Sequence, residues 1–261
     1  MIRLVTVPCV EFNLARLIAA ISEAHPDRVA LVHKSKQISF PTFVERYRRF
    51  GSALNASGLS CRVERSELEG HMSGQDHVAL FLNNECEYLE SMLGAWAGRV
   101  ASFNVNHRYI ADELHYLLTD ADAKAVVVNS MYAPNLAEVL PQLPNLGLIV
   151  QVPDESGNGL LPGAIYYEDF LREQEPRDLD DCSPDDLYLL YTGGTTGMPK
   201  GVLWRNADFF VGALGGLDRK TGLDYDSYAE VASAAARGTI KWMTSAPFMH
   251  GAAQWLSLIH I

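Results

Sequence analysis

The feature that most constrains the fold is a regular alternation of short apolar runs and helical patterns between residues 77 and 152. Four apolar runs predict strands at residues 77–82, 100–103, 124–128 and 146–152. Apolar side chains at helical spacing predict helices between them, at residues 85–98, 110–121 and 132–140. Strands separated by single helices imply right-handed crossovers and a parallel sheet with helices on both faces. The predicted fold class is α/β.

Further elements flank this core. Helical patterns are predicted at residues 13–24, 43–54, 167–173 and 206–214, with an amphipathic stretch at 228–236. Strands are predicted at residues 29–33, 37–40, 186–192, 202–204 and 241–246. Residues 60–75 are charged and aperiodic, which indicates a surface loop to which no function is assigned. Asn104 and Asn106 lie just past a predicted strand end, where sheets of this kind bind ligands, but a surface turn is their favoured role.

Composition excludes several functions. The net charge of −11 argues against a nucleic acid or an anionic membrane as partner. The four cysteines are scattered and form no Cys-x-x-Cys pair, which favours free thiols in the cytoplasm. The histidines lack metal-ligand spacing, so we predict no metal-binding residues, and no apolar run approaches the roughly 18 residues of a membrane span. No feature predicts an oligomeric state.

The segment at residues 191–202, which reads YTGGTTGMPKGV, follows an apolar run directly. It contains three glycines, three threonines and one lysine: Gly193, Gly194, Gly197, Thr192, Thr195, Thr196 and Lys200. The glycines allow positive φ and leave no Cβ to block a ligand. Backbone N–H groups of such a loop can form a nest for an anion. The threonines add neutral donors and the lysine adds a compact positive charge, so the segment suits a polyphosphate.

This loop differs from the P-loop of nucleotide hydrolases, Gly-x-x-x-x-Gly-Lys-Ser/Thr. Met198 and Pro199 occupy the positions where that spacing requires the second glycine, and Lys200 is followed by Gly201. Residues 202–204 predict a strand, so the loop joins two strands and does not open a helix. The alternative is a Gly/Thr-rich hairpin turn with an exposed lysine. It is disfavoured because the second turn at residues 199–201 serves no structural need.

Residues 191–202 closely resemble the signature loop of the adenylate-forming enzymes, which include acyl-CoA synthetases, luciferases and peptide-synthetase adenylation domains. Gly193 stands where the family usually has serine. The resemblance implies stacked, largely parallel sheets with flanking helices. It divides the chain into a first α/β subdomain at residues 1–176 and the start of a second at 177–261. It also implies that the loop holds ATP phosphates through Thr192, Gly193, Gly194, Thr195, Thr196, Gly197 and Lys200, with Lys200 acting in catalysis.

Residues 247–255 resemble the family's next motif, in which an aromatic or His-Gly pair borders the carboxylate substrate. A lone histidine is usually structural, but the resemblance implies that His250 and Gly251 contact a small-molecule carboxylic acid. Phe248 and Trp255 would then line the acyl side, with core packing an equal alternative. The expected cofactors are ATP, Mg²⁺ and coenzyme A.

The family's chains are longer than this one, and the resemblance fades after Trp255. We therefore expect an incomplete N-terminal domain without the C-terminal catalytic domain, inactive by itself. The segments at 193–198 and 248–255 look most like fatty-acid or steroid side-chain CoA ligases. A luciferase-like enzyme or a peptide-synthetase adenylation domain remains open, as does a non-catalytic nucleotide-binding remnant. Carboxylate-dependent ATP–pyrophosphate exchange separates the remnant from an enzyme.

Overall fold

The computed structural model describes residues 10–192, 198–218, 220–238 and 241–260, without the side chains of the last two. Within this part, seven strands form one sheet in the order β7-β6-β5-β3-β4-β8-β9. They are β3 (His77–Phe81), β4 (Ala101–Asn104), β5 (Ala123–Asn129), β6 (Leu148–Val152), β7 (Ile165–Tyr166), β8 (Leu187–Thr192) and β9 (Lys200–Arg205). Every neighbouring pair is parallel except β8 and β9. A separate antiparallel pair joins β1 (Val29–His33) and β2 (Lys36–Ser39).

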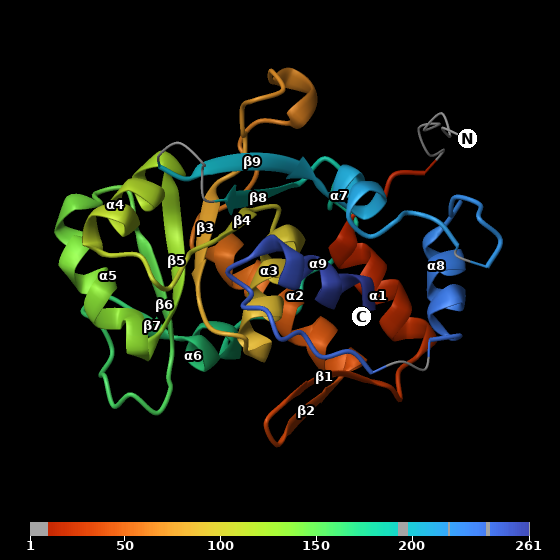
Figure 1. Cartoon of the computed structure of the whole chain (residues 1–261), viewed down its shortest axis with the longest axis horizontal. Helices are drawn as coiled ribbons and strands as arrows, with labels where there is room; N and C mark the ends of the chain where they lie inside the picture. Colours follow the sequence, from red (N-terminus) through yellow and green to blue (C-terminus); the bar gives the residue numbers. More distant parts are fainter. Residues whose placement is uncertain (1–9, 193–197, 219, 239–240, 261) are drawn as a thin grey trace.

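Helices cover both faces of the large sheet (Figure 1). One face packs against α4 (Ala111–Asp120) and α5 (Ala133–Val139). The other packs into a core shared by α1 (Leu14–Ala24), α2 (Phe40–Ala56), α3 (Cys86–Ala97), α6 (Tyr167–Arg172), α7 (Asn206–Gly212), α8 (Tyr228–Ala235) and α9 (Gly251–His260). Short 3₁₀ turns lie at Arg65–Glu67, Ser130–Tyr132 and Leu140–Gln142. The α/β class and the largely parallel sheet are confirmed.

Strand β3 explains why the central runs are apolar throughout. Val78 and Leu80 belong to the core that contains α2 and α3, whereas Ala79 and Phe81 belong to the core under α4 and α5. Successive side chains of a strand point to opposite faces, so a strand covered on both faces needs apolar residues at every position. The unbroken apolar run is therefore the sequence signature of a central strand.

Helices α2 and α3 approach each other so closely that their contact requires glycine. A Cβ added at Gly94 would lie 2.7 Å from the Tyr47 carbonyl oxygen and from Phe50 Cδ1. A Cβ added at Gly51 would lie 2.9 Å from the Gly94 carbonyl oxygen. Backbone meets backbone across this interface, so neither side can yield to an extra methyl group. The contact matters for the site because α3 follows β3 and supports the centre of the sheet.

The strand predicted at residues 241–246 is wrong: the described segment has no strand, because no described strand lies beside it to complete a ladder. The loop at residues 60–75 is a loop with one 3₁₀ turn, and the carbonyls of residues Glu69, Gly70 and Met72 accept hydrogen bonds from Arg65. The division at residue 176 stays a prediction, although β8 and β9 extend the same sheet as β3–β7.

None of the helices in the described ranges has the length and apolar character needed to cross a bilayer.

We predict that Gly94→Ala lowers the free energy of unfolding of the chain by about 1–3 kcal/mol, because the added methyl group cannot be accommodated between α2 and α3. Urea denaturation followed by circular dichroism measures the change. The matched control is Gly147→Ala, since Gly147 is exposed and an added Cβ there meets nothing within 4 Å. Equal effects of the two substitutions would contradict the packing argument.

Candidate functional site

The two described ends of the predicted phosphate loop, Thr192 and Lys200, lie at the carboxyl edge of the parallel strands. Strand β8 reaches this edge at Thr192, and β9 leaves it from Lys200 in the opposite direction. Thr192 and Lys200 are cross-strand partners, and both are exposed. The other predicted phosphate contacts, Gly193, Gly194, Thr195, Thr196 and Gly197, lie outside the described residues. Ligands of doubly wound sheets bind beyond this edge, and the phosphate contacts of Thr192 and Lys200 stay a prediction.

Tyr191 fixes the base of this hairpin. Its hydroxyl donates a hydrogen bond of 2.8 Å to Asp120 Oδ2 at the end of α4. Gly201 is its cross-strand partner, and a Cβ at that position would lie 2.8 Å from the Tyr191 ring. Glycine at 201 therefore lets the ring lie across the neighbouring strand, and the hydroxyl ties the hairpin to the helix layer beneath it.

The predicted carboxylate-binding pair lies beside the same strand. Phe248 and Met249 are buried, His250 is exposed, and α9 begins at Gly251. A Cβ at Gly251 would lie 2.8 Å from Leu190 Cδ2 of β8. Glycine at this position therefore lets the first turn of α9 touch the strand that carries the phosphate loop.

Asparagine side chains at the strand ends hold the segment before α9. Asn84, just beyond β3, donates to the Ala246 carbonyl oxygen at 2.9 Å and accepts from the Phe248 N–H at 2.6 Å. Asn104, the last residue of β4, donates to the Met249 carbonyl oxygen at 2.6 Å. The surface turn favoured for Asn104 is wrong, because its side chain is only 3% exposed. The sequence signal that indicates burial of Asn104 is its position directly after an apolar run.

Phe248 and Trp255 both pack against other aromatic rings. Phe248 lies 5.0 Å from the Tyr88 ring, and Trp255 lies 6.0 Å from the Trp204 and Phe209 rings, centroid to centroid. Phe248 is buried in the core of the described residues, and the half-buried Trp255 packs against that core. A role for either on the acyl side stays a prediction.

His107 was not singled out from the sequence, although it follows the same strand end as Asn104. Its ring stacks on Tyr132 at 5.6 Å, and Tyr132 stacks on Phe81 at 4.8 Å. Burial, followed by the charges of Arg108 and His250, lowers the pKa of His107. The neutral imidazole is therefore favoured on the side of the site that carries His250.

The described residues do not form a site that would hold Mg²⁺ through protein ligands. Within the described ranges, no group of three or more His, Cys, Asp or Glu side chains could hold a metal ion. Mg²⁺ prefers carboxylates and phosphate oxygens as ligands. The donor set of the described residues does not fit a protein-held Mg²⁺ ion.

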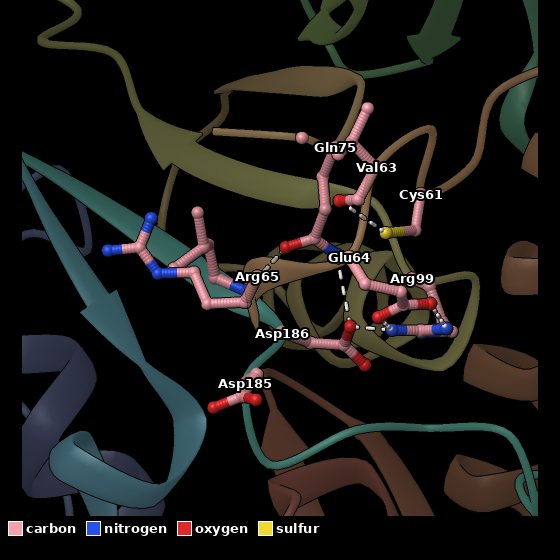
Figure 2. Close-up of a pocket in the computed structure, with 10 residues that line it drawn as sticks. Cys61, Val63, Glu64, Arg65, Gln75, Arg99, Asp185 and Asp186 are labelled. Atoms are coloured by element: carbon pink, nitrogen blue, oxygen red, sulfur yellow. Dashed lines mark hydrogen bonds and ion pairs between the residues drawn. The ribbon is translucent and has the colours of Figure 1, made fainter. Parts of the chain in front are cut away.

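Charged residues gather at the opposite, amino edge of the sheet (Figure 2). Arg99 makes a two-pronged ion pair with Glu64 at 2.8 and 2.9 Å, and its Nε donates to Asp186 Oδ1 at 3.0 Å. Gln75 donates to the same Asp186 oxygen at 3.3 Å. The cavity that they line has a volume of about 10 Å³, which holds one water at most. This cluster is structural and joins the 60–75 loop to the start of β8.

Asp186 is the most deeply buried acid of this cluster, at 1% exposure. Burial raises the pKa of its carboxyl group to about 7, although Arg99 and the Ser183 N–H act in the opposite direction. An acid with a raised native-state pKa binds its proton more tightly when folded than when unfolded. Its contribution to stability is therefore greatest below pH 3.8, its ordinary value, and is lost as the pH rises towards 7.

We predict that the stability advantage of the wild type over Asp186→Asn shrinks by about 2 kcal/mol between pH 5 and pH 7.5, because Asp186 loses its proton in this interval. Urea denaturation of both proteins at the two pH values measures it, and other titrating groups cancel in the comparison. An advantage that grows with pH would mean that Arg99 keeps the carboxylate ionised and that burial is the weaker effect.

The sequence of this chain matches a family model and several known proteins. The family model for AMP-binding enzymes matches residues 18–259. The medium-chain acyl-CoA ligase Mig of Mycobacterium avium is 46% identical over 247 residues, covering 94% of this chain and 45% of that protein. A medium/long-chain-fatty-acid–CoA/3-oxocholest-4-en-26-oate–CoA ligase of Mycolicibacterium smegmatis is 34% identical, covering 94% of this chain and 43% of that protein. The chain thus spans less than half the length of these relatives.

Solved structures share the fold at low sequence identity. The N-terminal domain of FACL13 from Mycobacterium tuberculosis matches with a TM-score of 0.67 at 20% identity, covering 96% of this chain and 55% of that one. A putative long-chain-fatty-acid CoA ligase from Rhodopseudomonas palustris matches with a TM-score of 0.68 at 20% identity and the same coverage.

Proposed function

Because the chain belongs to the AMP-binding enzyme family, we propose that it is part of an acyl-CoA ligase that activates a carboxylic acid with ATP. The observation that carries this proposal is the pairing of Thr192 with Lys200 at the carboxyl edge of the sheet. The turn before His250 is held beside the same strand, which supports binding of the two substrates next to each other.

The proposed reaction has two steps. A carboxylate oxygen of the acid attacks the α-phosphorus of ATP, and the bond from that phosphorus to the pyrophosphate oxygen breaks, which leaves an acyl-adenylate. The sulfur of deprotonated coenzyme A then attacks the acyl carbon, and AMP leaves with the electrons of the broken C–O bond. The first step places negative charge on the departing pyrophosphate, which fixed donors and cations stabilise most effectively.

We assign the stabilisation of this negative charge to Lys200 and to the loop at residues 192–197. Lys200 is exposed. The lysine ion pairs in the described part of the chain are made by Lys34, Lys36 and Lys124, and not by Lys200. Its ammonium is therefore available to a phosphate oxygen. Thr192 adds a hydroxyl donor across the ladder, and residues 193–197 would supply backbone N–H groups. Magnesium would arrive with the nucleotide, bound through phosphate oxygens.

The acid is assigned to the side of His250 and Gly251. We propose a medium- or long-chain fatty acid or a steroid side-chain acid, with the protein in the cytoplasm. The names of the relatives at 46% and 34% identity support this substrate class. The apolar and aromatic surroundings of Phe248 also suit an aliphatic chain.

Carboxylate-dependent ATP–pyrophosphate exchange tests the proposal. It is measured on this chain and on the longest product of its gene, with acids from butyrate to palmitate and a cholesterol side-chain acid. Exchange that requires an acid and is strongest with medium or long chains supports the proposal. ATP binding without exchange in the longest product would favour a non-catalytic nucleotide-binding protein.

We predict that Lys200→Ala weakens ATP binding by about 1–3 kcal/mol, because a charge in contact with phosphate is lost. Isothermal titration with ATP measures the change. Lys220→Ala is the control, since Lys220 is also exposed but lies in the turn between α7 and α8. Unchanged ATP affinity in Lys200→Ala would refute the role assigned to Lys200.

A further inference from the structure

Amide side chains hold the backbone of residues 246–249 from three directions. Asn84 comes from the end of β3, Asn104 from the end of β4, and Gln254 from α9. Asn84 binds the Ala246 carbonyl and the Phe248 N–H, Gln254 donates to the Phe248 carbonyl, and Asn104 donates to the Met249 carbonyl. The turn that precedes His250 is therefore positioned by side chains from distant parts of the sequence.

Asn104 also binds the backbone of β8, the strand that leads into the predicted phosphate loop, whereas Gln254 reaches β8 through the hydroxyl of Tyr188. The Asn104 Nδ2 donates to the Tyr191 carbonyl oxygen at 3.0 Å, and its Oδ1 accepts from the Tyr191 N–H at 3.0 Å. The parallel register of β4 and β8 ends with Phe103 opposite Leu189. The side chain thus continues the pairing of the strands beyond the point where the backbone ladder stops.

These bonds use both donors of the amide and one of the two lone pairs of its oxygen. Both Nδ2 hydrogens go to carbonyl oxygens, of Tyr191 and Met249, and Oδ1 faces an N–H. Only one orientation of the amide matches two acceptors and one donor in this way. Aspartate would lose both donors, and leucine would lose all three bonds while keeping a similar volume. The residue type therefore follows from the backbone groups that surround it.

We propose that Asn104 is a positioning residue that sets the spacing between the phosphate loop and the carboxylate-binding segment. It does so by joining Tyr191, one residue before Thr192, to Met249, one residue before His250. This inference rests on the proposed function, because it assigns ATP to the first segment and the acid to the second. In-line attack of the acid on ATP depends on this spacing, and a misplacement of about 1 Å can cost about 100-fold in rate.

The test compares the steady-state ATP–pyrophosphate exchange kinetics of Asn104→Leu and Asn104→Asp with those of the wild type. The substitutions are made in the longest product of the gene whose wild-type form catalyses exchange. We expect kcat to fall about 10- to 100-fold, with the KM values for ATP and for octanoate each within about threefold of wild type. Each substrate keeps its own contacts, whereas their relative placement is disturbed. Asn104→Asp should recover activity relative to wild type as the pH falls, because a protonated carboxyl regains one donor.

Two control variants separate positioning from simple loss of stability. Asn106→Leu lies two residues away, where the amide oxygen accepts from the Arg108 N–H within the same turn, and it should keep wild-type kcat. Gly94→Ala should lower the melting temperature without changing kcat at a temperature where it is folded. A kcat of Asn104→Leu equal to that of wild type would overturn the proposal. So would a loss of activity that follows the melting temperature alone, as in Gly94→Ala.

The outcomes for the two proposals are distinct. Absence of exchange in the wild type would count against the proposed function. Exchange in the wild type, with full kcat in both Asn104 variants, would leave the function standing and remove the role of Asn104. If Asn104→Leu does not fold, the pH dependence of Asn104→Asp, which has the same size as the wild-type residue, decides the question.

Discussion

The parallel arrangement of the central strands is the constraint on which the rest of this structure depends. Parallel strands need a crossover between each pair, so helices lie on both faces and every central strand is buried on both sides. The helices can cover the sheet only if they pack closely, and Gly51 and Gly94 permit backbone contact between α2 and α3. The same arrangement brings the ends of β3, β4 and β8 to one edge. The candidate site is thus a consequence of strand direction before any particular side chain is considered.

Much of the fold could be predicted from local patterns. Apolar runs and helical spacing identified the strands and helices between residues 77 and 152, because burial on one or both faces determines those patterns directly. The spacing of the glycines and Lys200 predicts a phosphate loop, and that role stays a prediction. The strand predicted at residues 241–246 failed because a strand requires a neighbour, and an apolar run does not say whether one is present.

The role of Asn104 could not be predicted for a different reason. Its partners, Tyr191 and Met249, lie 87 and 145 positions further along the chain. The place of Asn104 after an apolar run indicates burial but does not identify these partners, and an asparagine after a strand also fits a turn. Likewise, the aromatic residues Phe248 and Trp255 fit a pocket wall and a core equally well until their neighbours are known.

The two edges of the sheet are held together by different forces. The amino edge relies on charges, with Arg99 between Glu64 and Asp186, whereas the carboxyl edge relies on the neutral amides Asn84, Asn104 and Gln254. Dissolved ions screen exposed charges over about 8 Å at physiological ionic strength, but they do not screen hydrogen bonds between neutral groups. One sheet therefore combines an edge whose half-exposed Arg99–Glu64 ion pair responds to ionic strength with an edge where neutral amide hydrogen bonds, which do not respond to it, hold the segment before α9.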